Sequence, residues 1–181
     1  MKCLKCGSQL IPKEVSRYHY TESGLDNVYL TAVQVRRCPK CKTLMPEIPN
    51  LLYVQLCIAL YVIEKPGRLS GKEVRFLRKN LAMKSKEFAD KLGYTAQTFS
   101  RIEQGKAVIG PQGDRLVRLW FLAQKSAELS RFRSPVNVLQ HFHRVADMAA
   151  PDTPINIDTS SVSKICGTEN RPPGNVLNVA I

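Results

Sequence analysis

The spacing of apolar residues changes along the chain and separates a β-rich beginning from a helical remainder. Residues 14–22 and 27–37 are rich in β-branched and aromatic side chains, and the turn-forming residues Ser23-Gly24-Leu25-Asp26 join them. This pattern predicts two strands connected as a hairpin. Both faces of the second strand are apolar, which indicates that neighbouring elements cover it on both sides.

The segment from Asn50 to Glu64 is apolar nearly all round. Its length favours a helix. A helix without a polar face is expected to be buried between the N-terminal unit and another part of the chain, or in a dimer. Cys57 at its centre is then a small buried hydrophobic residue. Lys65-Pro66-Gly67-Arg68 ends the helix and forms a linker, because proline cannot continue the hydrogen-bond ladder.

Three short helices are predicted between residues 70 and 105. Glu73 follows Ser70 at the spacing of a capping box. The predicted caps are Ser70, Ser85 and Thr95, and the glycines that end the second and third helices are Gly93 and Gly105. Apolar residues recur at three- and four-residue steps, as expected for helices that share a core. These residues are Val74, Leu77, Leu81, Phe88, Ala89, Leu92, Phe99 and Ile102.

Two longer helices are predicted next, from residue 111 to about 128 and from residue 134 to 150. The first has enough apolar residues to close a core and leave a stripe for a partner subunit: Leu116, Val117, Leu119, Trp120 and Leu122. The second has one apolar face, which suits core packing or a dimer interface: Val136, Leu139, Phe142, Val145 and Ala149. From Pro151 onward proline, glycine and small polar residues dominate, which predicts a flexible tail.

The charge of the chain is concentrated in its middle third. The 181 residues include 27 Lys and Arg against 15 Asp and Glu, a formal net charge of +12. Residues 66–125 hold 13 of the basic and 5 of the acidic side chains. A basic excess confined to one segment is expected of a protein that binds nucleic acid, because Lys and Arg displace the counterions condensed on phosphate. A merely solvated basic surface is the alternative.

Four of the six cysteines form two matched pairs, Cys3-x-x-Cys6 and Cys38-x-x-Cys41, with 31 residues between them. Two such pairs supply the four thiolates of a tetrahedral zinc site, so we predict one structural Zn²⁺ per chain. A redox-active pair and an iron–sulfur cluster are the alternatives. Because four cysteines leave no open position, the site is expected to hold a small domain together. Its metal should contribute about 10 kcal/mol of apparent binding free energy, and without it this half should be largely unfolded.

The third of the three short helices presents a polar face that suits DNA reading. Two short helices separated by about three residues that include glycine are typical of the DNA-binding helix-turn-helix. Gln can pair with adenine, and Arg with guanine, through two hydrogen bonds each. The predicted base-reading residues are Gln97, Thr98, Ser100 and Arg101, and the predicted phosphate-neutralising residues are Lys84, Lys86, Lys91 and Lys106. An ordinary solvated helix, with Arg101 and Glu103 in structural ion pairs, is the alternative.

Two stretches of the sequence carry a family resemblance. Residues 72–106 resemble the Xre/Cro-type helix-turn-helix, through Phe88-Ala89-Asp90-Lys91-Leu92-Gly93 and Phe99-Ser100-Arg101-Ile102-Glu103-Gln104-Gly105-Lys106. Residues 3–41 resemble the YgiT-type zinc finger, through the two cysteine pairs and Tyr20-Thr21-Glu22-Ser23-Gly24-Leu25-Asp26-Asn27-Val28 between them. In this order, over about two thirds of the chain, the two are similar to the MqsA family of type II antitoxins.

The resemblance implies a function for each half. In that family the zinc domain binds a toxin or supports a dimer, and the helix-turn-helix domain dimerises and represses the promoter of its own operon. The base-reading pair of the family is an amide residue and an arginine one turn later, which fall on Gln97 and Arg101. The first of these is typically Asn, so Gln97 implies a changed operator.

These inferences combine into an α+β chain: a small zinc-bound β-hairpin domain, an all-α Xre-type helix-turn-helix bundle and a flexible C-terminal tail. The predicted parts are a zinc domain (1–49), a connecting helix and linker (50–68), the helix-turn-helix domain (69–130), a further helix that offers a dimer contact (131–150) and the tail (151–181).

We expect a DNA-binding repressor that acts as an antitoxin-like autoregulator; the alternative is an interaction module whose zinc domain neutralises a partner. An enzyme is not expected, because the sequence shows no catalytic triad, carboxylate pair or phosphate-binding loop. The expected partners are double-stranded DNA with a palindromic operator, a second copy bound through residues 111–150, and a cognate toxin. No apolar run reaches the roughly 18 residues that span a bilayer, and no signal-peptide core is evident, so we expect a cytoplasmic protein without a membrane partner.

Overall fold

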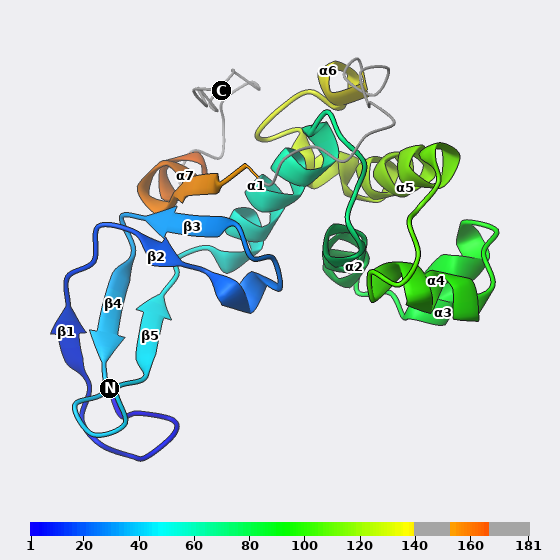
Figure 1. The fold of residues 1–181 in the computed structure, drawn as a ribbon. Coiled ribbons are helices and arrows are strands. Elements are labelled where there is room, and N and C mark those ends of the chain that lie inside the picture. The colour runs from blue at the N-terminus through cyan, green and yellow to red at the C-terminus, as the bar shows by residue number, and fades with distance from the viewer. Residues whose placement is uncertain (140–152, 167–181) are drawn as a thin grey trace.

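Two three-stranded sheets form the N-terminal part of the computed structural model, which describes residues 1–139 and 153–166 (Figure 1). The first sheet is antiparallel, in the order β1 (Ile11–Lys13), β4 (Gln34–Arg37), β5 (Leu44–Glu47). The second has the order β2 (Tyr18–His19), β3 (Val28–Thr31), β6 (Ile155–Asp158), with β2 antiparallel and β6 parallel to β3. A 3-10 turn, η1 (Thr21–Ser23), lies between β2 and β3.

The predicted hairpin is confirmed at its centre, where Tyr18 lies opposite Leu30. The prediction of one long second strand is wrong, because the chain breaks after β3 at Ala32, whose φ of 54° lies in the left-handed region. β3 and β4 therefore belong to different sheets. The buried positions change from even-numbered residues, Val28 and Leu30, to odd-numbered residues, Val33 and Val35. This shift explains why both faces of the segment look apolar in sequence. Strands β1 and β5 were not predicted, and of the first predicted strand, residues 14–22, only Tyr18–His19 is a strand.

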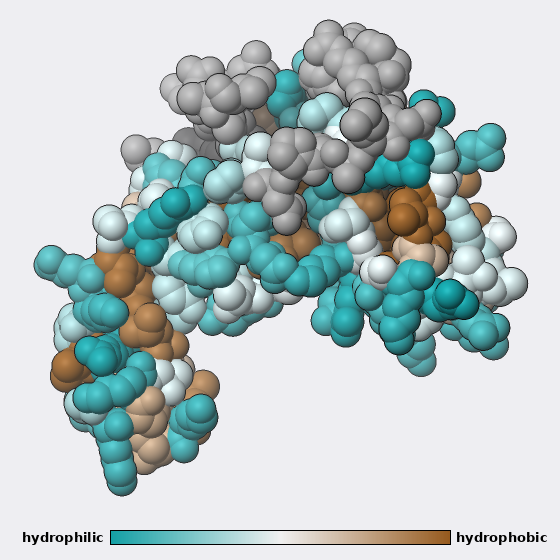
Figure 2. All heavy atoms as spheres, in the orientation of Figure 1, coloured by the Kyte–Doolittle hydropathy of each residue, from teal (hydrophilic) through white to brown (hydrophobic). Residues whose placement is uncertain are grey.

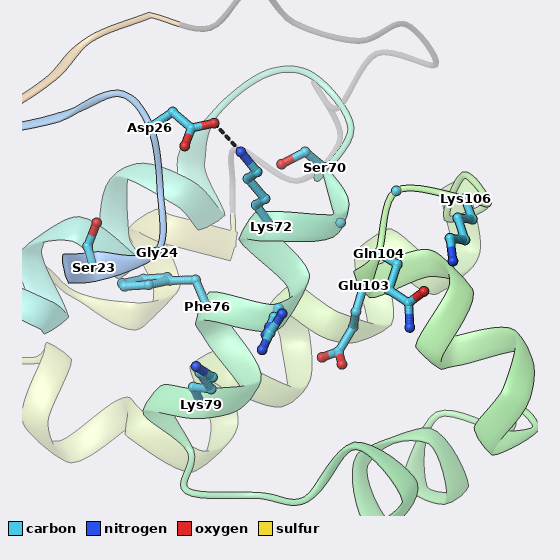
Figure 3. A pocket seen from close by; sticks show the side chains of 13 residues that line it. Ser23, Gly24, Asp26, Ser70, Lys72, Phe76, Lys79, Glu103, Gln104 and Lys106 are labelled. Carbon is cyan, nitrogen blue, oxygen red and sulfur yellow. Dashed lines mark hydrogen bonds and ion pairs between the residues drawn. The ribbon is translucent and has the colours of Figure 1, made fainter. Parts of the chain in front are cut away.

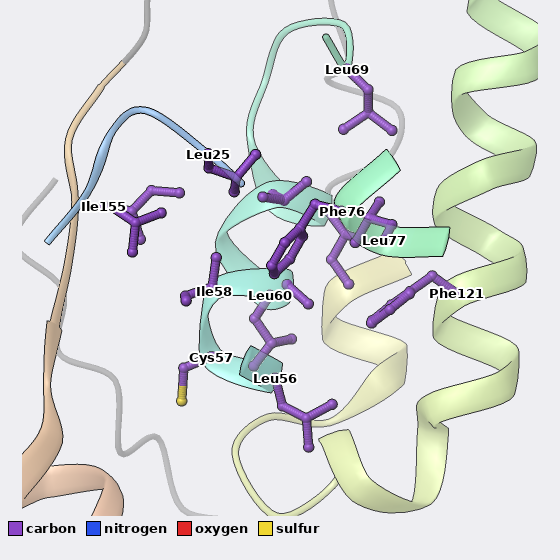
Figure 4. Packing of buried hydrophobic residues seen from close by; sticks show 14 of the residues in the cluster. Leu25, Leu56, Cys57, Ile58, Leu60, Leu69, Phe76, Leu77, Phe121 and Ile155 are labelled. Carbon is purple, nitrogen blue, oxygen red and sulfur yellow. The ribbon is translucent and has the colours of Figure 1, made fainter. Parts of the chain in front are cut away.

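Helix α1 (Leu51–Glu64) is buried, as its sequence predicts. Figure 4 shows it at the centre of the core, between Leu25 and Ile155 on one side and α2 and α5 on the other. Cys57 is fully buried there. The same apolar cluster includes residues of the second sheet and of the helical body, so these parts share one core. A separate small cluster consists of Cys3, Leu10 and Cys38.

Five helices of the body follow α1: α2 (Gly71–Asn80), α3 (Ser85–Lys91), α4 (Ala96–Glu103), α5 (Pro111–Leu129) and α6 (Pro135–Leu139). The capping box of Ser70 and Glu73 is present, and Thr95 Oγ1 accepts from the Thr98 amide. The Ser85 cap is wrong: Lys84 precedes the helix, and Ser85 Oγ donates to Glu103 Oε2 at 3.1 Å. No helix in the described part of the chain is long and apolar enough to cross a membrane.

A buried ion pair locks the linker against α5. Arg118 and Asp114 are both fully buried, and Arg118 Nε donates to Asp114 Oδ1 at 2.6 Å. The two terminal nitrogens of Arg118 donate to three backbone carbonyls, that of Ile63 in the last turn of α1 and those of Lys65 and Gly67 in the linker. Asp114 also accepts from the Leu69 amide at 2.6 Å. The linker between α1 and α2 is thus held by its backbone at three points, and the end of α1 at a fourth.

The flexible tail predicted from Pro151 is wrong for the part of it that the structure describes. β6 lies in register with β3, Val28 opposite Ile155, and is followed by α7 (Thr159–Cys166). Ile155 and Ile157 are buried while Asn156 and Asp158 between them are exposed, so the segment has the period-two pattern of a half-buried strand. The abundance of polar residues in the tail concealed this short alternation. The remaining tail residues lie outside the described ranges.

The predicted helix over residues 134–150 is described only as far as Leu139. Within that part Val138 is fully buried, whereas Val136 and Leu139, both assigned to the apolar face, are exposed. Val136 and Leu139 therefore do not pack into the core over the described turn, and the dimer contact on this face stays a prediction. Phe142, Val145 and Ala149 lie outside the described residues.

Candidate metal centre and nucleic-acid interface

The structure brings the four paired cysteines together at the far end of the first sheet, in a lobe that projects from the body (Figures 1 and 2). All four Sγ atoms lie within 4.8 Å of one another. The sulfur of Cys6 lies 3.4 Å from that of Cys38 and 3.6 Å from that of Cys41, and the sulfurs of Cys3 and Cys41 are 3.6 Å apart. Each pair sits on a tight turn; Gly7, which follows the first pair, has a φ of 72° that favours glycine.

This sulfur arrangement fits a tetrahedral metal ion. Zn–S bonds of about 2.3 Å place the sulfurs of a regular tetrahedron about 3.8 Å apart, close to the three distances above. The cluster could therefore hold one metal ion, with Cys3, Cys6, Cys38 and Cys41 as its ligands. Such an ion would cross-link the two cysteine turns and supply folding free energy, with no open position for substrate.

Hydroxyl groups beside the cluster favour the thiolate forms that bind metal. Thr43 Oγ1 lies 3.2 Å from Cys41 Sγ, and hydrogen bonds from Thr43 lower the pKa of Cys41 to about 6. The Ser8 side chain lowers the pKa of Cys6 in the same way. For Cys38 the Cys41 amide lowers the pKa, but burial and the neighbouring thiols outweigh it and raise the pKa to about 11. A metal ion that binds here must therefore displace the proton of Cys38.

Helices α3 and α4 pack against each other as the sequence predicts. Phe88 and Phe99, one from each helix, are fully buried with their rings edge to face and 5.6 Å between centroids. Gly93 in the turn between the helices has a φ of 73°, which a side chain would strain. Because Phe99 and Ile102 point into this core, the opposite face of α4 is presented to solvent.

The structure places three of the four predicted base-reading side chains on that open face. Gln97, Thr98 and Arg101 are exposed, and Ser100 is half-buried. Arg101 makes no ion pair within the described residues, so its guanidinium is available. Thr98 and Ser100 are less available: the Thr98 hydroxyl accepts from Thr95 Oγ1 at 2.9 Å, and Ser100 Oγ accepts from Gln104 at 3.1 Å.

The four predicted phosphate-neutralising lysines are all exposed around the α3–α4 pair: Lys84, Lys86, Lys91 and Lys106. Lys91 also lies over the ring of Trp120, 5.3 Å from its centroid. Lys84 precedes α3 and Lys86 is in its first turn, while Lys106 follows α4. These charges therefore flank α4.

Glu103 is in a structural ion pair, as the alternative drawn from the sequence allows, and its partner lies on another helix. Glu103 is bound by Arg78 of α2, at 2.6 and 3.1 Å through two nitrogens, and both side chains are about nine-tenths buried. Arg78 also donates to the Met83 carbonyl. This bidentate pair fixes the C-terminal end of α4 on α2. The two residues are 25 positions apart in the sequence, so no local pattern could have indicated this pair.

A second basic surface was also missed. Lys72, Arg75 and Lys79 are exposed on α2, three and four residues apart, and line a groove beside the end of α4 (Figure 3). In sequence they lie between the apolar residues of an amphipathic helix, where charges are ordinarily solvated.

The fold and the site together define an α+β protein in which a four-cysteine cluster is joined to a helical body. The sequence model of one family, described as the antitoxin component of a bacterial toxin-antitoxin system, MqsA, matches residues 1–131. The chain therefore belongs to the MqsA antitoxin family, and the resemblance found in its sequence is confirmed. No curated protein and no solved structure matches the chain. The family match ends before β6 and α7.

Proposed function

We propose that the protein is a sequence-specific DNA-binding repressor that regulates its own operon, with α3 and α4 as a helix-turn-helix and α4 as the recognition helix. The observation that carries the proposal is the exposed pair Gln97 and Arg101. The two lie four residues apart, so they share one face of a helix whose opposite face is locked into the core. Four exposed lysines surround this face.

The chemistry of the pair suits the major groove. Gln97 can contact adenine and Arg101 can contact guanine, each through two hydrogen bonds worth about 1 to 3 kcal/mol of discrimination. The capped N-terminus at Thr95 and the Arg78–Glu103 pair hold both ends of α4, which limits the conformational entropy lost when its side chains bind DNA. The surrounding lysines supply affinity without sequence preference.

A dimer would match a palindromic operator. Leu116 and Leu119 of α5 are 47% and 41% exposed, whereas Val117 and Leu122 of the same helix are buried. This division supports a second copy packed on the exposed side of α5. Leu119→Asp should then shift the sedimentation coefficient from dimer to monomer, while Val108→Asp, the same kind of change at an exposed apolar residue outside α5, should have a smaller effect. A wild-type protein that sediments as a monomer at all concentrations would refute the dimer.

The four-cysteine lobe has two proposed roles: it binds one structural Zn²⁺, and it belongs to the part of the chain that binds a toxin. The family match, which covers the lobe, supports the second role. The protein encoded next to this gene is the natural candidate. A stable complex of the two proteins would support toxin neutralisation, and the absence of any such complex would favour a stand-alone regulator.

A salt titration of DNA binding tests the repressor proposal. Binding to DNA upstream of the protein's own gene is compared with binding to scrambled DNA of equal length. Arg101→Ala should cost about 1 to 3 kcal/mol on the operator and little on scrambled DNA, because a base contact is lost. Lys86→Gln should weaken both equally and lower the slope of log affinity against log salt by about 0.9, because one fewer phosphate is neutralised. Equal effects of Arg101→Ala on both duplexes would refute sequence reading.

A further inference from the structure

A groove of about 940 Å³ opens between the turn at residues 23–26 and helix α2 (Figure 3). Its walls are that turn, the exposed side of α2 and residues 103–106 at the end of α4. α2 and α4 are in close contact at Gly71. A Cβ on this residue would lie 2.1 Å from the Ile102 carbonyl oxygen, so only glycine fits. The groove is therefore a continuous surface that begins where α4 ends.

Basic side chains dominate this groove. Lys72, Arg75 and Lys79 form one stripe along α2, and Lys106 adds a fourth positive charge. The two carboxylates of the groove are already paired, Asp26 with Lys72 and Glu103 with Arg78. Within the described residues, Arg75, Lys79 and Lys106 make no ion pair. Three cations are thus available to an anion that enters the groove.

We propose that the groove binds the phosphodiester backbone of duplex DNA as a continuation of the α4 interface, and that Asp26 restrains this binding. The inference rests on the proposed DNA-binding function. From Lys72 to Lys79 the stripe extends about 10 Å, at about 1.5 Å per residue. Phosphates of one DNA strand recur every 3.4 Å or so along the duplex axis, so the stripe can accompany about three of them.

The groove is connected to the recognition helix by Gln104 and Lys106. Both residues line the groove, and Gln104 Nε2 also donates to Ser100 Oγ on α4, at 3.1 Å. A DNA strand that passes the C-terminal end of α4 therefore meets the groove next. Apart from Phe76 and three glycines, the residues that line it are polar or charged, which suits a backbone contact.

Asp26 is held at the mouth of this groove by the sheet region. Its neighbour Leu25 is buried in the core, and its own carbonyl accepts from His19 Nε2 at 2.7 Å. The carboxylate pairs with Lys72 across the two regions (Figure 3). A negative charge here offsets part of the charge of Lys72 and repels phosphate. The sheet region thus lowers the DNA affinity of the helical body through one carboxylate.

Two pairs of variants test the groove and its restraint. Lys79→Gln is compared with Lys13→Gln, an exposed lysine of β1 outside the groove, and Asp26→Asn with Glu14→Gln, an exposed carboxylate elsewhere in the sheet region. Affinity for operator and scrambled DNA is measured by fluorescence anisotropy at several salt concentrations. Lys79→Gln should lower the slope of log affinity against log salt by about 0.9 on both duplexes, and Lys13→Gln should not. Asp26→Asn should raise affinity about three- to tenfold on both and steepen the slope by up to about 0.9, because Lys72 is released.

The outcomes separate this inference from the proposed function. Equal salt slopes for Lys79→Gln and Lys13→Gln would overturn the proposed groove. Equal DNA affinities for Asp26→Asn and Glu14→Gln would overturn the proposed restraint by Asp26. An operator preference that Arg101→Ala abolishes would leave the repressor standing in either case. If the wild-type protein does not distinguish operator from scrambled DNA, the repressor fails, whereas a lower slope for Lys79→Gln would still support a backbone site.

Discussion

The two sheets of this protein have three strands each, but different forces hold them. In the sheet β2–β3–β6 the residues Tyr18, Val28, Leu30, Ile155 and Ile157 are buried against α1 in the main core. In the sheet β1–β4–β5 only Val35 is buried among the strand residues, and the cysteine turns form a small cluster of their own. Apolar burial therefore stabilises the sheet β2–β3–β6, whereas we expect the sheet β1–β4–β5 to depend on a metal ion that cross-links the cysteine turns.

The difference between the two sheets limits how much of the N-terminal half should unfold when metal is lost. Metal loss is expected from the sequence to leave the N-terminal half largely unfolded, because a unit of about sixty residues buries little surface alone. The structure instead divides that half between two sheets and ties one of them to the helical body through α1 and β6. Metal loss should therefore unfold the projecting sheet and spare the other.

The largest expected effect comes from removing one thiolate. Cys38→Ser should release the metal and cost much of the roughly 10 to 16 kcal/mol of apparent binding free energy typical of such sites. Amide hydrogen exchange should then show loss of protection in β4 and β5, with β3 and β6 still protected. Cys57→Ser serves as the control, because Cys57 is a core residue distant from the cluster in sequence and should leave the metal content unchanged. Unfolding of both sheets together would contradict the division.

The junction between sheets and helices should be the next most sensitive place. Arg118→Leu leaves Asp114 charged and buried without its partner and leaves three backbone carbonyls without their donor, which should cost about 3 to 5 kcal/mol in urea unfolding. Arg115→Leu, an exposed arginine on the same helix, is the matched control and should change stability by less than about 0.5 kcal/mol. A similar cost for the two variants would show that the linker is not locked by Arg118.

A smaller effect is expected from the C-terminal strand. Ile157→Ala removes a side chain that is 3% exposed and should destabilise the protein by about 2 to 4 kcal/mol, whether or not metal is bound. Asn156→Ala, on the exposed side of the same strand, should cost far less. Thermal unfolding of both variants with and without a chelator measures the difference. If Ile157→Ala destabilised the protein only when metal is bound, the stability of β6 would depend on the sheet with the cysteine cluster, which contradicts this division.

Local patterns in the sequence predicted the features that depend on few residues. The cysteine pairs, the caps at Ser70 and Thr95 and the buried character of α1 are each determined within a few positions. Features that join distant segments could not be predicted this way. The Arg118 hydrogen bonds reach back more than fifty residues, and β6 pairs with a strand more than 120 residues earlier. The break at Ala32 was hidden because alternation on both sides of it reads as one strand.

The exposed face of α4 was predicted because helical periodicity separates Phe99 and Ile102 from Gln97 and Arg101. The basic stripe of α2 was not assigned, since its importance follows from its position beside the end of α4 and opposite Asp26. Sequence periodicity identifies an exposed face but does not tell which other segment lies across from it.

We propose that a metal-dependent lobe is attached to a DNA-reading body that folds without it. This is tested by the ratio of affinities for operator and scrambled DNA, measured by fluorescence anisotropy on the zinc-loaded protein and again after chelation. Chelation should leave this ratio within about threefold, because α4 is supported by the apolar core and by Arg78. Loss of the operator preference on chelation, with metal restoring it, would show that the DNA-reading body depends on the lobe.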